Sequence, residues 1–304
     1  MYASEQAHSS IIKAAMIAGI ASGPEDREHV RLVPVDASFA MDAPALARMI
    51  ADDIAAGKWP CFVCATLGTT GTLGFDSIVN IAAARGGAWL HIDAAHAGSA
   101  CVCPEFRWML EGVEHADSFC FNPHKWLLTN FDCDCFWVRD KRGLIDALSI
   151  TPEYLRNTAS DSGAVTDFRD LQVPLGRRFR ALKLWFVLRH YGVEGLRAQI
   201  REHVRLAGFL EDLVRADARF ELIGERRLNL VCFRLRGEGP AADERNKRLL
   251  DAVNASGRAF ITHTVVEVGG VRKYVIRAAI GATRTQERHV RALWELVQQC
   301  AAAL

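Results

Sequence analysis

The chain has 304 residues, of which 50% are hydrophobic and 24% are charged. That balance is typical of a globular protein, and the length is enough for one large domain or two ordinary ones. The 37 Lys and Arg nearly balance the 36 Asp and Glu. Electrostatics therefore give no argument for a nucleic-acid or anionic-membrane partner. Two short Arg-rich stretches, 176–183 and 224–229, are interrupted by apolar residues and indicate local surface or interface charge.

Nine cysteines, most of them inside apolar runs, are expected to be buried free thiols. A disulfide framework is typical of a small secreted domain. Cys61 and Cys64 are spaced as a CxxC pair, but residues three apart in a strand point to opposite faces, which suits no shared metal. The first apolar run lacks a basic segment before it, and charge interrupts every apolar run short of a membrane span. We expect a soluble, cytoplasmic protein without a membrane partner.

The first half of the chain alternates β-rich runs with amphipathic ones. The pattern predicts strands at 29–36, 60–68, 88–95, 117–123 and 133–140. Between them it predicts helices at 43–57 and 76–87. Apolar strands that alternate with helices are typical of a mostly parallel sheet covered on both faces. The sequence therefore predicts an α/β fold.

After Gly143 the pattern changes. Residues 151–177 are rich in turn-forming residues and lack a clear period, which predicts a functional or mobile loop. The elements expected after it are helices at 177–192, 193–216, 242–257 and 285–301 and strands at 220–223, 228–235, 259–266 and 273–280. This order predicts a second, smaller α+β domain.

Polar residues follow three of the predicted strands, where open α/β sheets bind ligands. Thr69 and Thr70 follow the strand at 60–68, Asp93 stands near the end of the next strand, and Lys125 comes shortly after the third. A further polar cluster, EQAHSS with His8, opens the chain before a helical run. We expect these side chains to lie near one edge of the sheet.

Lys125 stands in the apolar stretch FNPHKWLLTN. An apolar pocket disfavours the ammonium form of lysine and makes the amine a usable nucleophile. A pyridoxal phosphate (PLP) site combines such a lysine with an acid that keeps the pyridinium nitrogen protonated. Spacing alone leaves other interpretations open: Asp93 and Lys125 as a structural ion pair, His8 in a polar network at a helix start, and Thr69 and Thr70 as turn residues.

Longer motifs carry a family resemblance. Segment 89–140 resembles the active-site core of the group II PLP-dependent decarboxylases, and within them most resembles the aromatic L-amino-acid decarboxylases. The motifs that fit in order are SEQAHSS, ATLGTTGT, DAAHAGS, CPEFR, NPHKW, TPEYL, VPLGRRFRALKLWFVLRHYG and LVCFRL. The resemblance implies the fold of the PLP-dependent transferases (aspartate aminotransferase-like, fold type I). It further implies a PLP-binding large domain at 1–190 and a small C-terminal α+β domain at 191–304.

The resemblance also implies roles for single residues. Lys125 is similar to the Schiff-base lysine and Asp93 to the acid that contacts the pyridinium nitrogen. His8 is similar to the histidine that stacks on the cofactor ring and helps to position the substrate. The remaining cofactor contacts that the resemblance implies are Thr70, Asn122, Ala95 and His124.

Tyr154, in TPEYL, is similar to the catalytic-loop tyrosine that protonates the substrate carbon after carbon dioxide leaves. This similarity implies that 151–177 is a lid that excludes water. Family members with phenylalanine at this position tend toward aldehyde synthesis, so Tyr154 together with His8 favours simple decarboxylation. Gly176 stands where the similar histidine decarboxylases tend to carry serine, which favours an aromatic substrate.

Two departures from the family pattern stand out. His96, in DAAHAG, replaces a residue that is usually aromatic in the family and often tyrosine. The chain also begins just before SEQAHSS, whereas family members carry a preceding segment that completes the dimer, the phosphate site and the substrate pocket. We therefore expect a fragment or a truncated relative with weakened phosphate anchoring and exposed apolar surface.

Together these observations predict a PLP-dependent carboxy-lyase that acts as a homodimer without a metal. It would convert an aromatic L-amino acid of the DOPA, 5-hydroxytryptophan, tyrosine or tryptophan type to the amine and carbon dioxide. Two alternatives stay open: an aromatic aldehyde synthase of the same family, and a catalytically silent fragment that at most binds a partner subunit.

Overall fold

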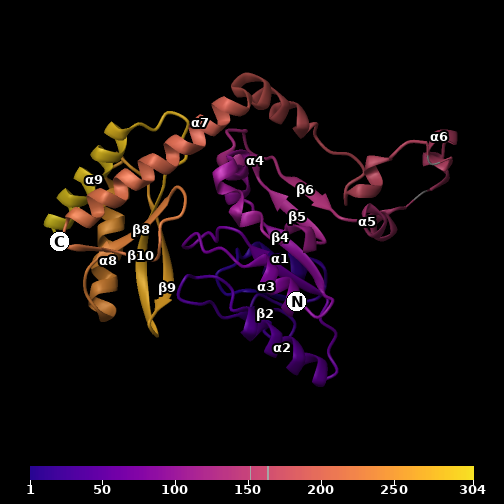
Figure 1. The fold of residues 1–304 in the computed structure, drawn as a ribbon, viewed down its shortest axis with the longest axis horizontal. Coiled ribbons are helices and arrows are strands. Elements are labelled where there is room, and N and C mark those ends of the chain that lie inside the picture. The colour runs from indigo at the N-terminus through magenta and orange to yellow at the C-terminus, as the bar shows by residue number, and fades with distance from the viewer. Residues whose placement is uncertain (151, 163) are drawn as a thin grey trace.

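The computed structural model of the chain describes residues 1–150, 152–162 and 164–304, so two residues of the predicted lid, Thr151 and Gly163, lie outside the described residues. The described elements form two β-sheets joined by a long helix, α7 (Arg180–Ala216) (Figure 1). The first sheet lies at the centre of Figure 1 and the second on one side, beneath α7. A segment that carries α5 and α6 projects on the opposite side.

The first sheet has six strands in the order β2-β1-β3-β4-β5-β6. All neighbours pair in parallel except β6, which is antiparallel to β5. Its strands are β1 Tyr2–Ser4, β2 Arg31–Val33, β3 Phe62–Thr66, β4 Trp89–Asp93, β5 Ser118–Phe121 and β6 Cys135–Val138. The predicted mostly parallel sheet is confirmed. Strand β1 was not predicted, because three residues are too few to carry a periodic signal.

Short helices follow the strands of this sheet. They are α1 Ser10–Ile17, α2 Ala43–Ala55, α3 Ile78–Ala84, α4 Pro123–Trp126 and the 3₁₀ helices η1 Ala97–Val102, η2 Pro104–Leu110 and η3 Val113–His115. Helix α2 begins where the Asp42 side chain accepts a hydrogen bond from the Ala45 backbone N–H, an ordinary N-cap. Its buried Leu46 and Ile50 pack into one core with Val63 and Leu90 of the strands.

The second sheet is antiparallel, in the order β7-β8-β10-β9. Its strands are β7 Phe220–Leu222, β8 Leu230–Leu235, β9 Thr262–Val268 and β10 Val271–Ala279. Gly269 and Gly270 join β9 to β10 with φ angles of 60° and 78°, a pair that suits a tight hairpin. Helices α8 (Gly239–Ala255) and α9 (Glu287–Ala302) complete this half, whose core includes Trp294.

Helix α7 was predicted as two helices, 177–192 and 193–216. In the structure it is one element, interrupted at Gly192, where φ is 62° and ψ is 177°. A positive φ is readily adopted only by glycine, so the chain can turn there. The predicted domain boundary between residues 190 and 191 lies beside this break, and the division into two domains stays a prediction.

In its described residues, the predicted loop contains short helices and no strand. The projecting segment carries α5 Lys141–Leu148, α6 Thr158–Asp161 and the 3₁₀ helices η4 Glu153–Leu155 and η5 Phe168–Leu171. Helix α5 was not predicted. It begins where the Asp140 side chain accepts a hydrogen bond from the Arg142 backbone N–H.

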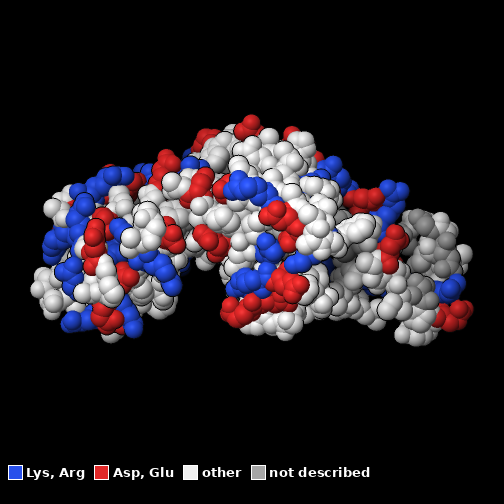
Figure 2. Space-filling model, turned by 90° about the horizontal axis from the view of Figure 1, so that it is seen from below, with Lys and Arg blue, Asp and Glu red and all other residues white. Residues whose placement is uncertain are grey.

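All nine cysteines are free, as predicted, but only Cys64, Cys103, Cys133 and Cys232 are buried; Cys61 is exposed and the other four are half-buried. In the described part of the chain, no group of His, Cys, Asp or Glu is arranged to hold a metal ion. Nor does any described helix combine the length and the apolar character that crossing a bilayer requires. On the face drawn in Figure 2, acidic and basic side chains are interspersed.

Candidate active site

A cavity of about 260 Å³ lies between the two sheets, at the carboxyl ends of the parallel strands. Ligand pockets typically measure about 300–1,000 Å³, so it is small but of the right order. Both sheets contribute to its walls. The first half of the chain supplies His8, Gly68, Thr69, Thr70, Leu73, His96 and Lys125, and the second supplies Leu230, Arg277 and Ala279.

The two threonines in the loop after β3, Thr69 and Thr70, differ in exposure. Thr69 is buried, and its hydroxyl accepts a hydrogen bond of 2.9 Å from the Gly74 backbone N–H. Thr70 is exposed and lines the cavity. Turn chemistry therefore accounts for Thr69, whereas Thr70 is free to contact a ligand.

Buried Asp76 holds the base of the same loop. Its two carboxylate oxygens accept hydrogen bonds of 2.7 Å from the backbone N–H groups of Met41 and Thr66. Burial raises the pKa of the Asp76 carboxyl to about 7, and the two N–H donors oppose that rise. The loop is thus held by a carboxyl that the sequence analysis did not single out.

Backbone contacts join the ends of β4 and β5. Asp93 is buried at the end of β4, and its Oδ1 accepts a hydrogen bond of 2.9 Å from the Ala95 N–H. The Ala95 carbonyl oxygen accepts one of 2.9 Å from the Asn122 N–H, and the Asn122 carbonyl oxygen accepts one of 2.9 Å from the Lys125 N–H. These contacts place Asp93, Ala95, Asn122 and Lys125 close together, at and just after the ends of β4 and β5.

Lys125 lies in the four-residue helix α4 and lines the cavity, but it is exposed rather than enclosed by apolar residues. Its amine makes neither a hydrogen bond nor an ion pair with any residue that the structure describes, Asp93 included. The alternative of a structural ion pair between Asp93 and Lys125 is therefore wrong for this structure. The next residue, Trp126, is 1% exposed and anchors the helix.

His8 takes part in a polar network at the start of α1 and also borders the cavity. Its Nδ1 accepts a hydrogen bond of 3.2 Å from the Ser10 backbone N–H and lies 2.9 Å from the Ser10 hydroxyl. The neutral ring therefore carries its proton on Nε2. The residue belongs to the polar network at the start of α1, and it also lines the cavity.

His124 faces a different cavity. Its Nδ1 lies 2.8 Å from the carbonyl oxygen of Cys133. It lines a neighbouring space of about 520 Å³ together with Asp134 and Arg177, among others. Burial raises the pKa of the Asp134 carboxyl, and the negative charge of Asp93 raises it further, whereas His124 and Lys125 lower it.

Tyr154 does not reach the cavity. It lies in η4, on the projecting segment, and is 83% exposed. Figure 1 shows that segment on the far side of the first sheet from the second sheet. Within one copy of the described chain, Tyr154 and Lys125 are therefore not brought together.

The sequence analysis missed Arg277 as a site residue. This half-buried residue of β10 donates from Nε to the Gly71 carbonyl oxygen at 2.9 Å and from Nη1 to the Thr262 hydroxyl at 2.8 Å. Burial lowers the pKa of its guanidinium. It pairs with no carboxylate of the described residues. No spacing in the sequence connects β10 with the first sheet, so no signal pointed to Arg277.

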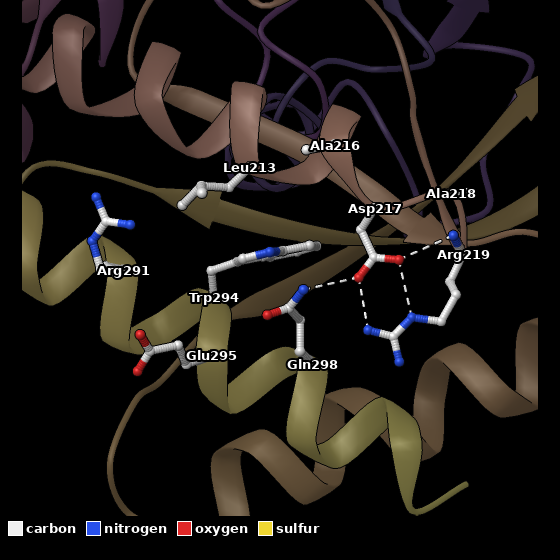
Figure 3. A pocket seen from close by; sticks show the side chains of 9 residues that line it. All are labelled: Leu213, Ala216, Asp217, Ala218, Arg219, Arg291, Trp294, Glu295 and Gln298. Atoms are coloured by element: carbon white, nitrogen blue, oxygen red, sulfur yellow. Dashed lines mark hydrogen bonds and ion pairs between the residues drawn. The ribbon is translucent and has the colours of Figure 1, made fainter.

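A larger cavity, of about 490 Å³, lies between the end of α7 and α9 (Figure 3). There the Asp217 carboxylate accepts hydrogen bonds from Arg219 and from Gln298, so these polar groups satisfy one another. None of the predicted site residues lines it. We therefore take the smaller cavity at Lys125 as the candidate site.

Known proteins are similar to this chain over almost its whole length. The family model described as "Pyridoxal-dependent decarboxylase conserved domain" matches residues 1–236. Tryptophan decarboxylase 2 of Oryza sativa subsp. japonica is 48% identical over 307 residues, which cover 98% of this chain and 60% of that protein. Phenylacetaldehyde synthase of a Rosa hybrid cultivar is 47% identical over 321 residues, with 100% of this chain and 61% of that protein covered.

Among solved structures, that of Oryza sativa TDC with PLP and tryptamine superposes with a TM-score of 0.92 at 45% identity. The match covers 99% of this chain and 62% of that one, which confirms the predicted fold. This chain spans about 60% of the length of the curated relatives it matches. Because the family model covers more than half of the chain, the chain belongs to the pyridoxal-dependent decarboxylase family.

Proposed function

We propose that the chain carries the cofactor site of an aromatic L-amino-acid decarboxylase. The observation that carries this proposal is the position of Lys125. Its amine lacks a partner among the described residues and lines a cavity at the carboxyl ends of parallel strands, beside the buried Asp93. The family is one of pyridoxal-dependent decarboxylases, and the donors at this site suit pyridoxal phosphate.

Two side chains fit the reactive ends of that cofactor. Lys125 offers a free primary amine to the aldehyde. Asp93 uses Oδ1 to accept from Ala95, while its Oδ2 makes no hydrogen bond with any described residue and can hold a protonated ring nitrogen. When bound, the cofactor supplies a ring that accepts the electron pair left as carbon dioxide departs. Lys125 would hold the cofactor at its aldehyde and Asp93 at its ring nitrogen.

Five other residues would contribute contacts in this proposal. His8 would contact the ring and would present its Nε2–H, because Nδ1 is engaged with Ser10. Thr70, Asn122 and Ala95 bind the ring substituents from the strand ends. His124 would act from the neighbouring cavity, which it lines.

Arg277 orients the substrate. Its guanidinium lines the cavity and lacks a carboxylate partner among the described residues, so it can bind the substrate carboxylate. Leu73 and Leu230 supply apolar wall for an aromatic ring. The relatives named above act on aromatic amino acids or make an aromatic aldehyde by name, which supports the same class of substrate.

We further propose a homodimer in which Tyr154 serves the cavity of a second copy. Tyr154 is 83% exposed and lies outside the cavity of its own chain. Large apolar side chains are also exposed at the start of α7, among them Phe179, Trp185 and Phe186. A second copy that covered them would bring Tyr154 Oη to the substrate α-carbon, to which it gives a proton.

An aromatic aldehyde synthase is the second candidate, because the rose relative bears that name. Tyr154 favours the decarboxylase, since the proton it gives to the α-carbon leads to the amine. Product analysis for amine against aldehyde plus peroxide distinguishes the two. We also propose a cytoplasmic location, which the nine free cysteines support.

The test is an absorbance spectrum of the purified chain with added PLP. We expect a band that disappears on borohydride reduction and is absent in Lys125→Ala, but is kept in Lys247→Ala, an exposed lysine of α8. Activity is then measured with L-DOPA, 5-hydroxytryptophan, tyrosine and tryptophan. If the wild-type chain gives no band, the proposal fails, and the chain is a silent fragment.

A further inference from the structure

Trp126, the residue after Lys125, lies between two histidines that come from distant parts of the chain. The ring of His96 stacks on it with a centroid distance of 4.9 Å and an interplanar angle of 1°. On its other side, the Trp126 Nε1–H donates a hydrogen bond of 3.0 Å to Nδ1 of His203 in α7. His96 follows β4 and lines the cavity.

The tautomer of His96 follows from its partner. The Nδ2 group of buried Asn229, just before β8, donates to the Ile280 carbonyl oxygen at 2.8 Å, which orients the amide. The Asn229 Oδ1 then lies 2.9 Å from His96 Nε2. Because an amide oxygen only accepts hydrogen bonds, His96 must carry its proton on Nε2.

Helix α4 cannot fix the direction of Lys125 by itself. It has four residues, Pro123–Trp126, and one turn of helix is unstable in isolation. A lysine side chain also has large rotamer freedom. The orientation of Lys125 therefore depends on how the buried Trp126 is held, and His96 is the contact of Trp126 that shares the cavity with Lys125.

We propose that His96 is a positioning residue for Lys125. Bound to Asn229 through Nε2–H, its ring fixes the plane of Trp126, and Trp126 fixes the direction in which Lys125 enters the cavity. The position of Asn229, which lies just before β8 of the second sheet, thereby influences the direction of the Lys125 amine. This inference rests on the proposed function of Lys125 as the group that reacts with the cofactor.

Three variants test the contacts of His96 with Trp126 and with Asn229 separately. His96→Phe keeps a ring for Trp126 but loses the N–H. Asn229→Leu removes the acceptor. His96→Gln keeps an N–H donor and a flat amide face, so it is the conservative replacement. The readout is the rate at which PLP forms a borohydride-trapped adduct on Lys125, measured well below the unfolding temperature of each variant.

We expect His96→Phe and Asn229→Leu each to slow the adduct about fivefold, the loss typical of one hydrogen bond. The double variant should be no slower than Asn229→Leu, because that variant has already lost the contact with His96. His96→Gln should stay within about twofold of wild type. A lower unfolding temperature with an unchanged adduct rate in His96→Phe would mean a merely structural role and would overturn the inference.

The protein without cofactor gives an independent readout. In a ¹H–¹⁵N correlation spectrum of the histidine rings, His96 should appear as the Nε2–H tautomer in the wild type and lose that preference in Asn229→Leu. An Nδ1–H tautomer in the wild type overturns the inference and leaves the proposed function intact. No adduct in the wild type overturns the proposed function, and with it the inference.

Discussion

Arg277 of β10 donates a hydrogen bond of 2.9 Å from Nε to the carbonyl oxygen of Gly71, a residue 206 positions earlier in the chain. The contact joins the second sheet to the loop after β3. A Cβ atom on Gly71 would lie 2.9 Å from Gln6 Oε1 and 3.1 Å from Thr264 Oγ1, so the absence of a side chain permits this close approach. Arg277 and Thr70, the residue before Gly71, both line the cavity at Lys125, so this contact between the two halves lies beside it.

Arg277→Gln should therefore impair the use of substrate. The change removes the charge proposed to bind the substrate carboxylate, and hydrogen bonds to charged groups contribute about 1.5–3 kcal/mol. We expect kcat/KM for the preferred aromatic amino acid to fall by about 10- to 150-fold. Arg272→Gln, on the same strand but exposed, is the control and should leave kcat/KM unchanged. Equal values for both variants would contradict the assignment.

Gly98→Ala should destabilise the first sheet near Asn122. A Cβ at Gly98 would lie 2.6 Å from the Cβ of Phe121 and 3.2 Å from that of Ala94, neither of which is the end of a flexible side chain. Overpacking of this kind costs about 1–3 kcal/mol of unfolding free energy. Gly143→Ala, which meets nothing within 4 Å, is the matched control. Denaturant unfolding of the two variants measures the difference.

Asp76 should make stability depend on pH. Burial raises the pKa of its carboxyl from 3.8 to about 7, so the folded chain binds this proton more tightly than the unfolded chain. The resulting stabilisation is complete below about pH 4 and is lost as the pH rises through about 7. It amounts to no more than about 4 kcal/mol.

Asp76→Asn cannot titrate, so its unfolding free energy should fall less than that of the wild type between pH 4 and pH 7. The asparagine has one acceptor oxygen, so either the Met41 or the Thr66 N–H loses its partner, at a cost of about 1–3 kcal/mol. Asp52→Asn, an exposed change in α2, should keep the wild-type slope. If the unfolding free energies of Asp76→Asn and wild type change with pH by the same amount, the predicted titration is refuted.

Tyr154→Phe should shift the product from amine toward aldehyde and peroxide, because the phenol that protonates the α-carbon is lost. Amine and aldehyde are quantified by chromatography after incubation with the preferred substrate. Tyr274→Phe, a half-buried tyrosine of β10 outside the cavity lining, is the control and should still form the amine. A product ratio unchanged from wild type would remove Tyr154 from the reaction.

Mixing two variants tests whether Tyr154 acts on a second copy. Lys125→Ala lacks the reactive amine, and Tyr154→Phe lacks the phenol. If the two groups meet across a dimer, a hybrid pairs an intact Lys125 with an intact Tyr154, and amine formation should return after the subunits are exchanged. No recovery in a mixture shown by light scattering to contain dimers would favour action within one chain.

The local pattern of the sequence predicted much of the site. Alternating apolar strands and helices indicated a parallel sheet, and polar residues at strand ends indicated where Asp93, Thr70 and Lys125 would gather. Motif resemblance added an expected role for His8. These predictions depend on neighbours within one strand and the loop that follows it, so the sequence carries them directly.

Other features were decided only by tertiary structure. The contact of His96 with Asn229 spans 133 residues, and that of Arg277 with Gly71 spans 206. Neither follows from periodicity, because periodicity reports which face of an element is buried and not which distant element covers it. For the same reason Lys125, expected in an apolar pocket, proved exposed. The sequence by itself determined the parallel sheet and the polar residues at its strand ends, whereas packing of the second sheet on the strand ends decided the shape of the cavity.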